Sequence, residues 1–373
     1  MNNTNITYCD LEQFSKNFKS YHMYLSLFVC IFGSILNILN IFILSTKQMR
    51  CPTNCILTSL AVADVLVMLE YIPFAYLHDK STTSSHYFTY NFAAFIIFHA
   101  LFTQSFHFIS CCITIILAVW RYIAVKFPQN NSKWCSNERT KATILLTYIL
   151  CPFICIPLFL SIDITKMNAF ISSEGKVIFK PKVNQTDLKN ATIYFANYKQ
   201  NTILKDISFY VYGVIIKLVP CILLTVLSTL LIIELLAAKE RRKKLLNPTA
   251  DNGVVKKKVQ QRHLDREKQA DRTTKMLLAV LLLFLMVEFP QAIFGLLNHI
   301  VGEKFDRECY QPLGDLLDIF TLTNSAINFI LYCIMSQKFR EVFKANFFPY
   351  IPCFKKMKNQ WISLQTVNTL VEI

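Results

Sequence analysis

The first twenty residues, MNNTNITYCDLEQFSKNFKS, lack an apolar core of their own. A cleavable secretory signal needs an apolar stretch of about 7–15 residues behind a basic start. We therefore expect no cleavable signal peptide here, and we expect the first long apolar segment to direct the chain to a membrane.

Charged residues are also scarce, at 17% of the 373 residues, whereas 53% are hydrophobic and 13% are aromatic. A water-soluble domain of that composition would expose large apolar patches. The apolar residues come in uniform blocks and do not alternate with polar residues as they do in outer-membrane β-strands. Because a helical span needs about 20 predominantly apolar residues, the blocks predict spans near residues 23–45, 54–77, 92–125, 142–162, 206–236, 274–299 and 312–335.

The predicted fold class is therefore all-α, a seven-transmembrane helix bundle. We expect an extracellular segment 1–22, a membrane domain 23–335 with a long cytoplasmic loop 237–273, and a cytoplasmic tail 336–373. The tail starts with SQKFREVF, which predicts a short amphipathic helix on the membrane lipid.

The distribution of basic residues predicts the orientation. Lys and Arg collect after the first span, between the third and fourth spans, after the fifth span and in the tail. By the positive-inside rule these segments are cytoplasmic, which leaves the N-terminus outside, although the stretch 164–205 is also rather basic. The net charge of +15 then indicates contact with anionic lipid and not with nucleic acid.

Glycosylation sequons give an independent check on this orientation. One sequon, at Asn130, falls in a segment expected inside, where it should be silent. The four sequons in segments expected outside are at Asn2, Asn5, Asn184 and Asn190.

Of the thirteen cysteines, only Cys9 and Cys309 fall in segments expected outside. The others lie within spans or at the inner face, where the compartment is reducing. Two exposed cysteines in an oxidising space usually pair, so we expect a Cys9–Cys309 disulfide, with a covalent dimer as the alternative.

Polar residues inside spans point to the bundle interior or to a water-filled cavity and are functional candidates. In the third span five of them follow one another at spacings of 4, 4, 3 and 4, which places them on one helix face. That stripe has a plainer explanation as interhelical hydrogen bonding. The predicted ligand-binding residues are Glu70, His99, Thr103, Gln104, His107, Lys217, Glu288, Gln291, Asp315 and Asp318.

Glu288 is the most demanding of these residues, since an unpaired charge in a span costs about 3 kcal/mol on insertion scales. Lys217 and Glu288 both lie about 11 residues from the outer ends of their spans, or roughly 16 Å deep. We therefore expect them to pair at the floor of an outer vestibule of acids and histidines. The alternative is a protonated Glu288 that is hydrogen-bonded to a neighbour such as His107.

The sequence lacks the motifs that would indicate several other classes of protein. There is no His-Glu-x-x-His and no Gly-flanked serine, so an enzyme is not indicated. Cys151 and Cys155 have no further metal ligands near them, and no metal or cofactor is predicted. A transporter would show internal repeats, and none is apparent.

Several short motifs now carry a family resemblance. They are LAVAD ending in Asp64, the Trp120-Arg121-Tyr122 triplet with Pro128 after it, VEFP in the sixth span and NSAINFILYCIMSQKFREVF at the end of the seventh. The chain resembles the rhodopsin-like, class A, G-protein-coupled receptors over nearly its whole length. The segments PTNCILTSLAVADVLVMLEYIPF, LAVWRYIAV, VEFPQ and INFILYC are similar to invertebrate myosuppressin and FMRFamide-like neuropeptide receptors.

The resemblance implies a plasma-membrane receptor for an extracellular peptide, cationic and amidated, with an Arg-Phe-amide end as the specific expectation. A receptor of the same class for another small ligand is the alternative. A heterotrimeric G protein, Gi/o by resemblance, would bind after the sixth span moves outward. The residues to which the resemblance assigns signalling roles are Asn37, Asp64, Trp120, Arg121, Tyr122, Pro220, Pro290, Asn324, Asn328 and Tyr332.

Asp64, Asn37 and Asn328 would form a polar core, which is a candidate site for Na⁺. Without the resemblance, Asp64 would be explained as a satisfied buried polar group and Arg121 as a residue snorkelling to the interface.

The sequence also departs from the family pattern. Trp120 stands where an acid usually precedes the arginine, Phe329 replaces a proline after Asn328, and Glu288 replaces a tryptophan. Neither the top of the third span nor the second outer loop has the cysteine that usually joins them.

Two candidate sites lie in the tail. Cys353, beside Lys355 and Lys356, is a candidate for palmitoylation, or else a free thiol. The last residues, Val371-Glu372-Ile373, fit a strand added to a PDZ domain, or else an uncommitted tail.

Overall fold

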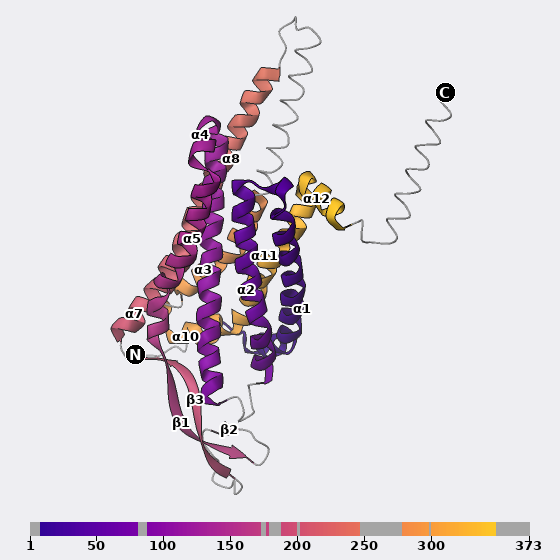
Figure 1. Ribbon diagram of the computed structural model, residues 1–373. Coiled ribbons are helices and arrows are strands. Elements are labelled where there is room, and N and C mark those ends of the chain that lie inside the picture. The colour runs from indigo at the N-terminus through magenta and orange to yellow at the C-terminus, as the bar shows by residue number, and fades with distance from the viewer. Residues whose placement is uncertain are drawn as a thin grey trace, which may run out of the picture.

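A computed structural model gives the fold of the chain (Figure 1). The described residues are 8–80, 88–172, 177–178, 188–199, 202–246, 278–297 and 300–347.

Among these residues, seven helices are long and apolar enough to cross a membrane, as predicted. They run over Glu12–Leu44, Pro52–Leu77, Tyr90–Lys126, Asn137–Ser161, Ile203–Ala238, Leu278–Leu297 and Arg307–Ile334. The first three correspond to α1 (Glu12–Leu44), α2 (Pro52–Lys80) and α3 (Tyr90–Lys126), and the fourth to α5 (Asn137–Ile154) followed by α6 (Ile156–Ser161). The fifth combines α7 (Thr202–Tyr210), η3 (Val211–Leu218) and α8 (Val219–Leu246), and the seventh combines η4 (Asp306–Tyr310) and α11 (Gln311–Met335).

Two helices extend past the predicted ends of their spans. The helix α1 begins at Glu12, so half of the segment 1–22 is already helical. The helix α8 continues to Leu246, so the loop expected at 237–273 starts as helix, and its remainder lies outside the described residues. Polar helical turns beyond a span have no hydropathy signal, which is why the apolar blocks end before the helices do.

The connections add short elements, η1 (Lys47–Met49), α4 (Pro128–Trp134), α10 (Glu303–Phe305) and α12 (Gln337–Phe347). The predicted amphipathic helix is α12, which buries Phe339 and Val342. It is anchored by Arg340, whose Nη1 donates to the carbonyls of Cys333 and Ile334 at 3.1 and 2.8 Å. Those carbonyls belong to the last turn of α11, where no intrahelical donor is available.

A sheet was not predicted by the all-α interpretation. The strands β1 (Ile162–Ser172), β2 (Val177–Ile178) and β3 (Leu188–Tyr198) form an antiparallel sheet in the order β2-β1-β3. The sheet extends from one end of the bundle, while α4 and α12 lie at the other end (Figure 1). Its strands carry Thr, Ile, Tyr and Phe, which favour extended backbone, between membrane spans that dominate the hydropathy signal.

The sheet is fixed to the third span by backbone and aromatic contacts. The N–H of Tyr194 donates to the carbonyl of Phe88 at 3.0 Å. The rings of Phe88 and Phe195 lie 5.3 Å apart and those of Tyr90 and Tyr194 lie 5.8 Å apart, both edge-on. These contacts join the start of α3 to β3, the two places where the family's usual disulfide has no cysteine.

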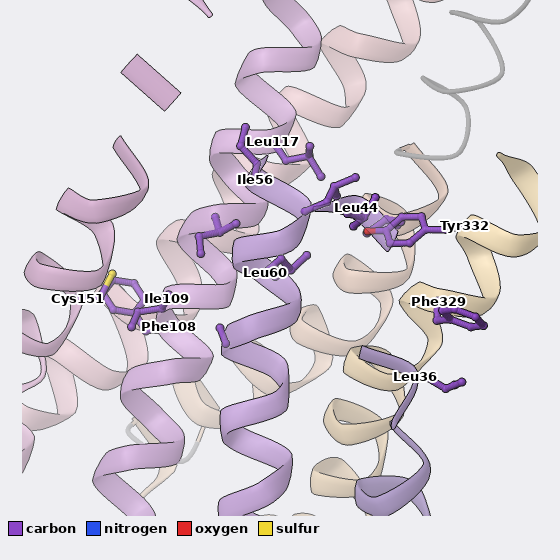
Figure 2. Close-up of a cluster of buried hydrophobic side chains, with 14 of the residues drawn as sticks. Leu36, Leu44, Ile56, Leu60, Phe108, Ile109, Leu117, Cys151, Phe329 and Tyr332 are labelled. Atoms are coloured by element: carbon purple, nitrogen blue, oxygen red, sulfur yellow. The ribbon is translucent and has the colours of Figure 1, made fainter. Parts of the chain in front are cut away.

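The largest buried cluster joins α1, α2, α3, α5, α11 and α12 and includes Tyr332, Phe329, Leu44, Ile56 and Leu117 (Figure 2). The outward faces of the helices remain apolar and exposed, as Leu145 and Phe153 are at 63% and 62%. In a soluble protein such surface would be unfavourable, but it suits the hydrocarbon of a bilayer.

Gly33 is required where α1 meets its neighbours. A Cβ at this position would lie 2.7 Å from Met68 Sδ and 2.9 Å from the Cβ of Ala326, so it would force α1 away from α2 and α11. Overpacking of this kind costs about 1–3 kcal/mol.

We therefore expect Gly33→Ala to lower the Tm of the purified receptor by several degrees. Gly314→Ala is the matched control, because a Cβ there meets nothing within 4 Å and alanine favours a helix over glycine by about 1 kcal/mol. Equal Tm values for the two variants would contradict this account of the packing.

Candidate functional site

One buried polar cluster lies where the third, fifth and sixth spans meet. Pro220 has no N–H to donate to the preceding turn, and its ring crowds the carbonyl four residues earlier. The helix accommodates this by widening into the π-helical segment η3, which carries Lys217. Lys217 and Glu288 are 5% and 1% exposed, so both charges are buried.

The predicted Lys217–Glu288 pair is present. Lys217 Nζ lies 3.1 Å from Glu288 Oε2, 3.1 Å from His107 Nε2 and 2.8 Å from Gln291 Oε1. An ammonium has three protons to donate and no acceptor, so these three contacts account for all of its donors. His107 Nε2 also lies 3.0 Å from Glu288 Oε2, so the neighbour named in the alternative expectation is part of the same cluster.

Gln291 connects this cluster to the seventh span. Its Nε2 donates to the carbonyl of Leu317 at 3.1 Å and to Thr321 Oγ1 at 2.6 Å. Removing one partner of a buried ion pair costs more than the pair contributes to stability. The cluster thus links the third, fifth, sixth and seventh spans. Because a buried ion pair often adds little to stability, the cluster is a candidate for a functional role.

A second cluster lies nearer the sheet. His99 Nδ1 lies 2.8 Å from Glu70 Oε2, and Thr103 Oγ1 donates to the same oxygen at 2.9 Å. The hydroxyl of Tyr71 donates to Asp318 Oδ2 at 3.2 Å and lies 3.3 Å from His22 Nε2. This network joins α1, α2, α3 and α11.

His22 and Tyr71 were missed by sequence reasoning. His22 lies just before the predicted first span, and Tyr71 lies within the apolar block 54–77. Tyr71 follows Glu70 directly, and that neighbour is the only sequence signal that would have drawn attention to it.

Two other predicted ligand-binding residues, Gln104 and Asp315, are not part of the two clusters described above. Gln104 is half-buried, and its Nε2 has no hydrogen-bond partner among the described residues. Asp315 is half-buried on α11, one turn before Asp318. Both remain candidates by position.

The polar core is formed in part as predicted. Asp64 accepts hydrogen bonds from Ser110 Oγ and Asn328 Nδ2, each at 3.2 Å. Asn37 is buried nearby, but its Nδ2 donates to the carbonyls of Gly33 and Ser325, each at 3.0 Å. It therefore joins α1 to α11 through the backbone and not through the Asp64 carboxylate.

At the end opposite the sheet, the Trp120-Arg121-Tyr122 triplet lies in the last turns of α3, which ends at Lys126. Trp120 Nε1 donates to Thr140 Oγ1 at 3.0 Å, while Arg121 Nε is buried without a partner among the described residues. Tyr332 is 2% exposed and belongs to the main hydrophobic cluster.

One further ion pair crosses this end of the bundle. Lys126 Nζ lies 3.0 Å from Glu234 and donates to the hydroxyl of Tyr122 at 2.7 Å. It links α3 to α8, and sequence reasoning did not find it because the two residues lie far apart in the chain.

The remaining predicted signalling residues are Pro220, Pro290 and Asn324, and they differ in burial. Pro220 is buried, Pro290 is exposed on the sixth span two residues after Glu288, and Asn324 is half-buried on α11.

The predicted disulfide is present between Cys9 and Cys309, whose Cα atoms lie 5.4 Å apart. The N–H of Tyr8 donates to Glu308 at 2.8 Å, and the rings of Tyr8 and Phe305 lie 6.1 Å apart, edge-on. The N-terminal segment is thus fastened to the start of the seventh span.

We expect non-reducing peptide mapping of cell-surface receptor to yield one peptide pair joined through Cys9 and Cys309. Closing so long a loop stabilises the chain by several kcal/mol in the chain-entropy model, so Cys9→Ser should lower the Tm. Two free thiols, or a covalent dimer on a non-reducing gel, would contradict the intramolecular bond.

Of the predicted modification and tail sites, only Asn190 lies among the described residues. Asn190 is exposed on β3. Asn2, Asn5, Asn184, Cys353 and the C-terminal Ile373 lie outside the described residues.

Seven spanning helices that enclose polar clusters from several helices define a seven-transmembrane receptor. Residues 24–349 match the family described as serpentine type 7TM GPCR chemoreceptor Srw. The chain therefore belongs to this family of G-protein-coupled receptors. Proteins of this family are signalling receptors and not enzymes, and this one is a multi-pass protein of the plasma membrane.

Three relatives illustrate the similarity. The chain is 28% identical to the G-protein coupled receptor dmsr-1 of Caenorhabditis elegans, over 88% of this chain and 68% of that protein. It is 27% identical to the sex peptide receptor of Drosophila melanogaster, over 86% and 71% of the two chains. It is also 27% identical to the thyrotropin-releasing hormone receptor of Bos taurus, over 86% and 76%.

Proposed function

We propose that the chain is a rhodopsin-like receptor for a cationic, amidated neuropeptide, with its N-terminus outside the cell. The observation that carries the proposal is the buried Lys217–Glu288 pair, which we place at the floor of an outer vestibule that Glu70, Asp315 and Asp318 would line. A carboxylate that deep needs a cation, and a ligand with its own cation can compete for that place.

The orientation is supported by the two ends of the bundle. The sheet with Asn190 and the Cys9–Cys309 disulfide belong to one end, and disulfides form in an oxidising compartment. The basic segments around α4 and α12 lie at the other end (Figure 1). We assign that second end to the cytoplasm by the positive-inside rule.

A peptide ligand is supported by the relatives, which include receptors for sex peptide and for thyrotropin-releasing hormone. The quoted motifs add the resemblance to myosuppressin and FMRFamide-like receptors. Glu70, Asp315 and Asp318 give the vestibule an acidic character that favours a cationic peptide. An Arg-Phe-amide end would bring a guanidinium and a neutral, uncharged terminus into this space.

The proposed mechanism starts at the floor of the vestibule. A ligand cation competes with Lys217 for Glu288, which weakens the link between the fifth and sixth spans. Because Gln291 also bonds Lys217 and the seventh span, the change reaches Thr321 and α11. The sixth span then moves outward, Tyr332 rearranges and Arg121 engages the G protein, for which we favour Gi/o.

A panel of peptides ending in Arg-Phe, each as the amide and as the free acid, tests the ligand class in receptor-expressing cells. We expect the amides to activate at least about tenfold more potently, or about 1.4 kcal/mol, because a terminal carboxylate is repelled by the acidic vestibule. Separate calcium and cAMP readouts with defined Gα subunits identify the G protein. A response to non-peptide ligands alone would favour the alternative, a receptor of the same class for another small molecule.

The Lys217–Glu288 pair makes a second prediction. Lys217→Met should raise basal signalling, because it removes the restraint on the sixth span. Glu288→Gln should lower peptide potency by at least about tenfold, and exchanging the two charges should restore part of the basal restraint without the ligand response.

These variants are compared at matched surface expression with Lys166→Met, which removes an exposed lysine from β1. Wild-type basal activity and potency in both single variants would show that the pair is structural only.

A further inference from the structure

The contacts around His107 show an unusual crowding of ligand atoms at one point. His107 Nε2 lies 3.0 Å from Glu288 Oε2, 3.1 Å from Lys217 Nζ and 3.7 Å from Cys111 Sγ. His107 and Cys111 are one helical turn apart on α3, so their side chains project from the same face. A nitrogen, a sulfur and a carboxylate oxygen therefore converge between the third and sixth spans.

The Lys217 ammonium is the cation at this point, and it lies 3.1 Å from both His107 Nε2 and Glu288 Oε2. A neutral imidazole nitrogen either donates or accepts, and an ammonium only donates. In the tautomer in which His107 Nε2 accepts from Lys217, that nitrogen and Glu288 Oε2 present lone pairs to each other across 3.0 Å. The two acceptors then share one positive charge, which a metal ion could also supply.

A second observation shows that the carboxylate is not saturated. Glu288 Oε1 is buried and has no hydrogen-bond partner among the described residues. Cys111 is 1% exposed, and its thiol contacts His107 Nε2 at 3.7 Å. The Glu288 carboxylate and the Cys111 sulfur would each gain a bond if a metal ion took the place of the Lys217 ammonium between them.

We propose that His107, Cys111 and Glu288 form a binding site for a zinc-class transition-metal ion, which displaces the ammonium of Lys217. Imidazole, thiolate and carboxylate are the side chains that bind Zn²⁺, and three of them leave a fourth position open. All three ligand atoms lie within 4.8 Å of one another.

The observed separations are close to those of a tetrahedral site. Bond lengths of about 2.0–2.1 Å to nitrogen and oxygen and about 2.3 Å to sulfur place N and S about 3.6 Å apart and N and O about 3.3 Å apart. The corresponding distances here are 3.7 and 3.0 Å. The third separation, between Cys111 Sγ and the Glu288 oxygen, is at most 4.8 Å, so a side-chain rotation of Cys111 or Glu288 would have to bring these two atoms to about 3.6 Å.

Charge balances when two protons leave as one Zn²⁺ enters. The thiol of Cys111 loses its proton to solvent as the sulfur–metal bond forms, so the ion binds with one thiolate and one carboxylate. The Lys217 ammonium loses the second proton and remains as a neutral amine beside Gln291 Oε1, now 2.8 Å away, so no unpaired charge is left in the cluster.

A bound ion would join α3 to the sixth span through three coordinate bonds. Since those two elements must separate for the sixth span to move, we expect Zn²⁺ to hold the receptor in its resting conformation. The metal site itself is independent of the proposed peptide, and binding can be measured without any ligand.

The direct test uses the purified full-length receptor and Co²⁺ as a spectroscopic probe. Co²⁺ should give a thiolate-to-metal charge-transfer band in the near ultraviolet, and Zn²⁺ should remove the band by competition. Cys111→Ala should abolish the band, whereas Cys112→Ala, the neighbouring thiol outside the triad, should leave it intact. Absence of the band in the wild-type receptor, or its loss only with Cys112→Ala, would overturn the proposal.

The competition with lysine provides a second, independent measurement. Lys217→Gln removes the resident charge but keeps a polar group beside Gln291, so it should tighten Zn²⁺ binding at least about tenfold, which is about 1.4 kcal/mol. The Zn²⁺-dependent rise in Tm should shift to lower zinc concentration by the same factor. Unchanged or weaker zinc binding in this variant would show that the metal does not occupy the lysine's place.

Discussion

The Lys217 ammonium is the interaction on which the interior of this receptor depends. Its three protons are divided among His107, Glu288 and Gln291, and Gln291 passes the connection on to α11. In a low-dielectric interior an unpartnered charge is far more costly than in water. The third, fifth, sixth and seventh spans must therefore keep a common register at this depth, whatever their lipid-facing surfaces do.

The need to pair buried polar groups also explains why those groups form hydrogen-bonded pairs between spans at several levels of the bundle. Glu70 with His99, Asp64 with Asn328, and Tyr71 with Asp318 each join residues from different spans. Apolar packing between helices in a bilayer is nearly indifferent to a shift along the helix axis, because lipid tails are as apolar as leucine. The hydrogen-bonded layers supply the positional specificity that the apolar contacts do not.

The spans and the contact between Lys217 and Glu288 were predictable from the sequence, because both follow from the positions of apolar and charged residues along the chain. Hydropathy gives the helices, and the rise per residue gives the depth of each charge. The π-helical segment η3, the sheet, and the partners His22, Tyr71 and Glu234 were not predictable in this way. They depend on which helices become neighbours, and on aromatic or polar residues that look unremarkable within an apolar or basic stretch.

The Cys9–Cys309 bond has a topological consequence. The residues it joins are 300 positions apart, so the first six spans lie inside one covalent ring, and the ring closes within the first turn of the seventh. A single backbone cut anywhere within that ring leaves both fragments attached to each other. A protease acting on an outer or inner loop would thus nick the receptor without releasing any span, until a reductant opens the ring.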